Sequence, residues 1–79
     1  MPRLPLSATL RAQLRQRIRD RNEELQIKDA AAAERLGLTP AQMSRLNGDE
    51  DIFTLDRLVD AAARVGLTVR MRATRPYKT

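Results

Sequence analysis

Apolar residues recur near the start of the chain at the spacing of an α-helix. Leu10, Leu14 and Ile18 lie four residues apart, and this spacing places their side chains on one face of an amphipathic helix. Ser7 stands just before the stripe, where its side chain is suited to cap the first helical turn. The pattern therefore predicts a first helix from about residue 8 to about residue 22.

A second helix is predicted over residues 28–36. It contains four consecutive alanines, residues 30–33, which combine high helix propensity with little side-chain bulk. Their small size allows another helix to approach closely, so we expect them to be packing residues. Gly37 follows and is suited to the left-handed conformation that commonly ends a helix.

A third helix is predicted to follow at once. Thr39 is a good N-cap, and Pro40 occupies the first helical position, where the N–H that proline lacks is not needed. The helix is expected to end at Asn47, because Asn47-Gly48 is a turn dipeptide. About three residues, beginning with Gly37, separate the second and third helices, and this is the spacing of a helix-turn-helix.

The last part of the chain changes its hydrophobic period. Thr54 is a further N-cap and Gly66 a further helix end, so a fourth helix is predicted between them. Its buried stripe is expected to consist of Leu55, Leu58, Val59, Ala62 and Val65.

After Gly66 the apolar residues Leu67, Val69 and Met71 alternate with polar ones. This alternation predicts a short strand over residues 67–72. A single strand is unstable in water without a neighbour, so we expect it to pair with the same strand of a second copy. Leu67, Val69 and Met71 are therefore the predicted dimerisation residues.

Together these elements predict an all-α fold. A four-helix helix-turn-helix domain is expected over residues 8–66, followed by the short C-terminal β-strand that pairs across a dimer. Residues 1–7 and 73–79 are expected to be N-terminal and C-terminal tails.

The composition narrows the classes of function. The chain has 79 residues with no cysteine and no histidine, so we expect one domain without disulfides, metal or other cofactors. No catalytic residues are expected either, because the chain also lacks a glycine-rich phosphate loop and a suitable pair of acids. No apolar run approaches ~18 residues, which favours a cytoplasmic protein with no membrane partner. A domain this small has a marginal core, so a homodimer is expected to stabilise it.

The net charge of +5 is unevenly distributed. Residues 1–22 carry six arginines and one acid (+5), residues 23–60 four cations and nine acids (−5), and residues 61–79 five cations and no acid (+5). Thirteen of the fifteen cations are arginine, whose planar guanidinium suits phosphate and guanine edges. The basic ends favour a polyanionic partner.

From residue 27 to residue 58 the sequence resembles the lambda-repressor-like, or XRE-type, helix-turn-helix family. The resemblance rests on the small residues of the second helix, on Leu36-Gly37-Leu38-Thr39 and on Met43-Ser44-Arg45-Leu46. The continuation from residue 51 to residue 70 resembles a compact antitoxin-like subgroup. This likeness implies a homodimeric repressor bound to double-stranded operator DNA, which as an antitoxin neutralises a RelE-like toxin and represses its own operon.

The resemblance also implies which residues contact DNA. In this architecture the third helix lies in the major groove. With Met43 directed to the core, a rotation of about 100° per residue turns Ala41 and Arg45 outward and places Gln42 and Ser44 beside them. We therefore expect these four to be the base-reading residues, with Gln42 pairing with adenine and Arg45 with guanine.

Phosphate contacts are expected at the starts of two helices. Lys28 begins the second helix, and Thr39 and Pro40 begin the third. Helix N-termini present free backbone N–H groups to phosphate oxygens.

Two alternatives to the antitoxin remain open. A free-standing regulator of a phage or plasmid would use the same DNA-binding fold without a toxin. A protein interaction module would retain the fold without DNA binding. The last alternative is motivated by Asp49-Glu50-Asp51, which follows Gly48 where family members often carry a basic residue.

Overall fold

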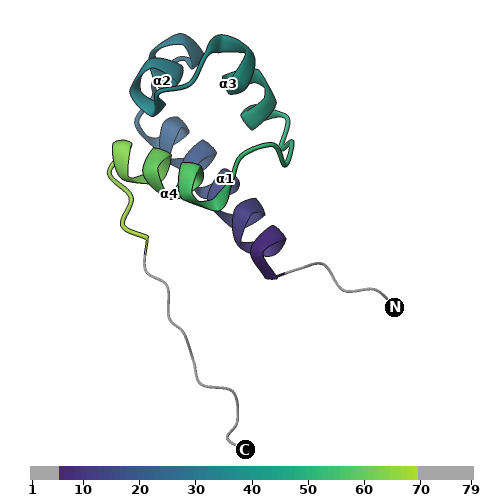
Figure 1. Ribbon diagram of the computed structural model, residues 1–79. Helices are drawn as coiled ribbons and strands as arrows, with labels where there is room; N and C mark the ends of the chain where they lie inside the picture. Colours follow the sequence, from purple (N-terminus) through teal and green to yellow (C-terminus); the bar gives the residue numbers. More distant parts are fainter. Residues whose placement is uncertain (1–5, 70–79) are drawn as a thin grey trace, which may run out of the picture.

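The computed structural model describes residues 6–69 and contains four helices in that range. They are α1 (Leu6–Glu24), α2 (Asp29–Leu36), α3 (Pro40–Asn47) and α4 (Leu55–Arg64). Figure 1 shows α2 and α3 together at one end of the domain, with α1 and α4 packed side by side at the other. The predicted four-helix order is confirmed.

Helix α1 is longer than predicted at both ends. It begins at Leu6 and runs for 19 residues to Glu24, so Ser7 lies inside the helix and the prediction that it is the N-cap is wrong. Helix boundaries are the least certain part of a pattern-based prediction, because good helix formers such as glutamate extend a helix beyond its apolar stripe. Of the predicted stripe, Ile18 is fully buried, whereas Leu10 and Leu14 are half-buried.

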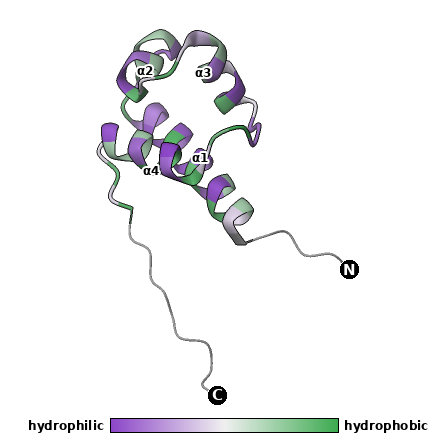
Figure 2. Ribbon diagram, viewed as in Figure 1, coloured by the Kyte–Doolittle hydropathy of each residue, from purple (hydrophilic) through white to green (hydrophobic). Residues whose placement is uncertain are grey.

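The core lies where the four helices meet. In Figure 2 hydrophobic and hydrophilic residues alternate along each helix, as expected for helices with one buried face. Met43 and Phe53 belong to the core, as predicted. The buried hydrophobic residues are Ile18, Ala32, Ala33, Leu36, Leu38, Met43, Leu46, Phe53, Leu58, Ala61, Ala62 and Val65.

The turn between α2 and α3 forms as its sequence predicts. Gly37 adopts the left-handed conformation with φ 74°, and its N–H donates to the carbonyls of Ala33 and Glu34. The side chain of Thr39 accepts a hydrogen bond from the Gln42 N–H at 3.1 Å. These two local devices fix where α2 ends and where α3 begins.

The C-terminal segment departs from the prediction. Thr54 caps α4 as expected, and Gly66 follows the helix with φ 83°. Residues 67–69 form no strand in the described part of the chain; Leu67 and Val69 instead pack against the core. Met71, the remainder of the predicted strand and the tail at residues 73–79 lie outside the described residues. Alternating apolar residues specify a buried face, and here the domain's own helices cover that face in part.

Within residues 6–69, none of the helices combines the length and the apolar character needed to cross a membrane.

Candidate nucleic-acid interface

Helix α3 presents the face that the sequence predicted. Its buried residues are Met43 and Leu46, which are 3% and 1% exposed. Ala41, Ser44 and Arg45 are exposed on the opposite side. Because the apolar face is held against the core, the polar face is fixed in direction and open to a partner.

Gln42, the fourth predicted base-reading residue, is half-buried and engaged in a capping box. Its side-chain oxygen Oε1 accepts a hydrogen bond from the backbone N–H of Thr39 at 3.0 Å. The Arg57 side chain, from α4, approaches the same oxygen, with Nη2 at 3.5 Å from Oε1. The Gln42 side chain is thus held in one orientation at the start of α3.

The predicted phosphate-binding residues differ in what they offer. Lys28 is the N-cap of α2 and is exposed, with no side-chain capping bond. Thr39 uses its backbone N–H and its hydroxyl oxygen in the capping box, which leaves its hydroxyl hydrogen to donate. Pro40 has no N–H, so Ala41 supplies the free backbone N–H in the first turn of α3, with no acceptor among residues 6–69.

A network of arginines and aspartates, which the sequence analysis missed, joins α1 to the loop after α3. Arg11 Nε lies 2.7 Å from Asp51 Oδ1 and Arg15 Nε lies 2.8 Å from Asp49 Oδ1. Arg15 Nη1 reaches Asp51 at 3.0 Å, and Arg19 Nη1 reaches Asp49 at 3.1 Å. The spacing of the three arginines, which puts them on one face of α1, was the available signal.

This network also fixes the end of α3. Arg19 Nη1 donates to the carbonyl oxygen of Leu46 at 3.0 Å, in the last turn of the helix. The same carbonyl also accepts the backbone N–H of Asp49 at 3.0 Å, and the cation beside it complements the negative end of the helix dipole. Asp49 adopts a left-handed conformation with φ 58°, which aspartate tolerates better than most residues.

Hydrogen bonds from the arginines of α1 favour the charged forms of Asp49 and Asp51. Hydrogen bonds from Arg15 and then Arg19 hold the pKa of Asp49 below its ordinary value. A hydrogen bond from Arg11 does the same to the pKa of Asp51. The loop that looked like an unpaired acidic segment beside the reading helix is therefore neutralised by α1.

Cations remain around the helix-turn-helix once this network is accounted for. Lys28, Arg35, Arg45 and Arg57 are exposed, and none forms an ion pair with an acid of the described residues. Arg57 Nη2 lies 3.4 Å from the carbonyl oxygen of Gly37, in the turn between α2 and α3. The acids Asp29 and Glu34 of α2 are exposed and unpaired as well, so residues 28–47 carry three cations against two acids, although residues 23–60 are acidic in sum.

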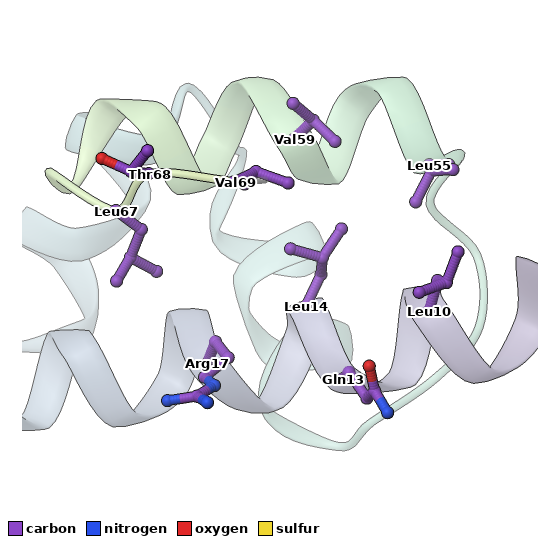
Figure 3. Close-up of a pocket in the computed structure, with 9 residues that line it drawn as sticks. All are labelled: Leu10, Gln13, Leu14, Arg17, Leu55, Val59, Leu67, Thr68 and Val69. Atoms are coloured by element: carbon purple, nitrogen blue, oxygen red, sulfur yellow. The ribbon is translucent and has the colours of Figure 1, made fainter. Parts of the chain in front are cut away.

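A second surface is the groove between α1 and α4 (Figure 3). Its volume is about 390 Å³, and Gln13, Arg17 and Thr68 contribute its polar lining. Its apolar lining consists of Leu10, Leu14, Leu55, Val59, Leu67 and Val69. Two predicted dimerisation residues, Leu67 and Val69, are thus brought together with the half-buried ends of the α1 and α4 stripes.

Comparison with known families agrees with this geometry. A family model described as a helix-turn-helix domain matches residues 6–74. No curated protein and no solved structure matches the chain. The matched segment includes all four helices, and the two-helix unit with its short turn is the one with which DNA-binding regulators enter the major groove. The chain therefore belongs to this helix-turn-helix domain family.

Proposed function

We propose that this protein is a sequence-specific DNA-binding repressor rather than an enzyme, with α3 as the helix that enters the major groove. The observation that carries the proposal is the exposed face of α3. Arg45 lies there, in the last turn of α3, without an acidic partner among the described residues. Arg57 reaches the turn between α2 and α3, and Lys28 lies at the N-terminus of α2. Arginine on such a helix is suited to the O6 and N7 acceptors of guanine.

The ion pairs that Asp49 and Asp51 form with arginines of α1 support DNA binding over a protein interaction module. A free acidic loop beside the reading helix would repel phosphates. Here both carboxylates are bound by arginines of the same domain, so the loop presents little negative charge to DNA.

As the finer form of the proposal, the protein is the antitoxin of a type II toxin–antitoxin pair that represses its own operon. Its support is the resemblance of residues 51–70 to a compact antitoxin-like subgroup of the XRE-type family. A RelE-like toxin would be the protein partner. A free-standing phage or plasmid regulator is the second candidate, and the identity of the neighbouring gene distinguishes the two.

The proposed repressor is a homodimer whose copies meet at the groove between α1 and α4. The groove leaves six apolar side chains half-buried in one copy, and a second copy would bury them further. The apolar groove residues of α1 and α4 lie on other faces of these helices than Arg15, which contacts the loop after α3, and Arg57, which contacts the turn between α2 and α3. A partner in the groove therefore leaves α3 uncovered.

DNA binding is tested by fluorescence anisotropy against the duplex upstream of the gene, with a scrambled duplex as control. We expect Arg45→Ala to reduce the preference for the upstream duplex, and Lys28→Ala to weaken binding to both duplexes alike. Arg17→Ala removes the same charge at the groove and, compared at a concentration at which it sediments as the wild-type protein does, should leave the preference unchanged. Equal binding of the wild-type protein to both duplexes would refute sequence-specific repression.

The dimer is tested by sedimentation of Val59→Asp, which places a charge in the groove. We expect the proportion of dimer to fall while the helical circular dichroism is retained, because an unpaired charge is costly to bury. Ala31→Asp, at an exposed position of α2, is the matched control. An unchanged sedimentation profile for Val59→Asp would exclude this dimer surface.

A further inference from the structure

The oxygen of the Gln42 side chain is already used within the domain. It accepts the Thr39 N–H at 3.0 Å. Only an acceptor can bind this N–H, so the amide must place Oε1, and not Nε2, toward Thr39. The orientation of the amide is thus fixed by the cap of α3.

Arg57 is a second donor within reach of the same oxygen. Its Nη2 lies 3.5 Å from Gln42 Oε1 and 3.4 Å from the carbonyl oxygen of Gly37. An amide oxygen has two lone pairs; the Thr39 N–H uses one, and Arg57 is the second donor within reach of this oxygen. The positive guanidinium also disfavours the approach of any further N–H donor to that oxygen.

The nitrogen of the same amide remains able to donate hydrogen bonds to a ligand. Nε2 of Gln42 donates no hydrogen bond to residues 6–69. It is also not sealed in the protein, because in that part of the chain the buried side-chain atoms without a partner are those of Asn22. Gln42 therefore offers an outside ligand two N–H donors and no free acceptor.

We propose that Gln42 reads its base only as a hydrogen-bond donor, and so selects a keto base, guanine or thymine, over adenine. This assignment rests on the proposed DNA-binding function and deepens it. A glutamine pairs with adenine by donating to N7 and accepting from the N6 amino group, whereas guanine and thymine offer acceptors, O6 and N7 or O4. With Oε1 occupied, the N6 amino group of adenine meets a donor instead of an acceptor.

Within this assignment Arg57 is a positioning residue. It touches the oxygen of Gln42, not the base that Gln42 contacts. Its removal frees one lone pair of Oε1, which then becomes able to accept from adenine. The discrimination against adenine at one base position should therefore weaken, whatever happens to the overall affinity.

The test begins by selecting bound duplexes from a pool with a random central segment. The position that Gln42 reads is the one at which Gln42→Ala loses its preference. At that position we expect the wild-type protein to bind the keto base about fivefold more tightly than adenine, the effect of one net hydrogen bond. Gln42→Glu retains an acceptor for the Thr39 N–H, as in other capping boxes, but has no N–H donor. This variant should lose the keto preference while remaining folded by circular dichroism.

Arg57→Ala gives a second readout. The ratio of keto-base to adenine affinity should fall toward one at the Gln42 position and stay unchanged at the position mapped by Arg45→Ala. A merely structural role of Arg57 would change both positions together, and that result would overturn its assignment.

Three results would overturn the assignment of Gln42. These are an adenine preference of the wild-type protein at the mapped position, a keto preference that survives in Gln42→Glu, and the absence of any position that responds to Gln42→Ala. If Arg45→Ala alters preference in the same selection, the proposed DNA-binding function stands even when the Gln42 assignment fails. If the wild-type protein enriches no duplex, the proposed function fails as well.

Discussion

Asp49 and Arg15 form one ion pair, but the two residues differ greatly in burial. The Arg15 side chain is 5% exposed, whereas that of Asp49 is 54% exposed. Asp49→Asn leaves a buried guanidinium with Asp51 as its carboxylate partner in the described structure. Arg15→Met leaves an aspartate that is in water and still has Arg19 beside it. Removal of a partner costs most when the group left behind is buried, so we expect Asp49→Asn to be the more destabilising change.

The contacts of Asp49 set the size of the effect. It accepts two charge-assisted hydrogen bonds, from Arg15 at 2.8 Å and from Arg19 at 3.1 Å. Changing a charged acceptor to a neutral one costs about 1 kcal/mol per bond, and the exposure of this carboxylate reduces the sum by about half. We expect the free energy of unfolding to fall by about 1 kcal/mol for Asp49→Asn. For Arg15→Met a change within about 0.5 kcal/mol is expected, because methionine preserves the burial of the apolar stem.

The free energy of unfolding of both variants is measured by urea titration, with circular dichroism as the signal. One protein concentration is used throughout, because the stability of a dimer depends on concentration. Asparagine tolerates the positive φ of position 49, so backbone strain does not contribute. A loss of 1 kcal/mol should lower the melting temperature by about 4–8 °C in a domain of this size. Greater destabilisation by Arg15→Met than by Asp49→Asn would refute the reasoning from burial.

Two further predictions concern stability. In the folded protein, a hydrogen bond from Arg15 lowers the pKa of Asp49, and one from Arg11 lowers the pKa of Asp51. The stabilisation from these two carboxylates is therefore complete above about pH 4 and is lost as the pH falls through the lowered pKa values. Urea midpoints should therefore fall more steeply below about pH 4 for the wild-type protein than for Asp49→Asn/Asp51→Asn, and parallel curves would contradict this origin. Asn22 is 7% exposed, and neither its Nδ2 nor its Oδ1 has a partner in residues 6–69. We expect Asn22→Leu to raise the free energy of unfolding by about 1 kcal/mol, measured by the same titration; a decrease would mean that these atoms are hydrogen-bonded in solution.

The helix-turn-helix unit was predictable from the sequence because local residues determine it. Gly37 ends α2 through its own backbone freedom, and Thr39 caps α3 through a bond to a residue three positions away. The side-chain directions within α3 follow from helix geometry once Met43 faces the core. The exposed faces of Ala41, Ser44 and Arg45 were therefore foreseen.

The periodicity of α1 and α4 was read less completely. It placed Leu10 and Leu14 on the apolar face of α1, but it did not show which neighbouring element covers them. In the structure Ile18 is enclosed by the domain, while Leu10 and Leu14 face the groove shared with Val59. An apolar stripe predicts that its residues are buried, but the packing of the helices decides how far each of them is buried and against which element. The predicted strand failed over residues 67–69 for the same reason.

The sequence by itself determined four helices, the turn that makes α2 and α3 a helix-turn-helix, and the polar face of α3, since each depends on residues within a few positions. Only the tertiary structure decided which charged residues form ion pairs. Arg15 lies 34 residues from Asp49 in the sequence, and no local rule pairs them. The tertiary fold turns an acidic loop into a neutralised one, and it brings Arg57 from α4 onto the oxygen of Gln42. Charge interactions act between residues that are near in space, so a count along the chain assigns the sign of a segment but not the sign of the surface that it forms.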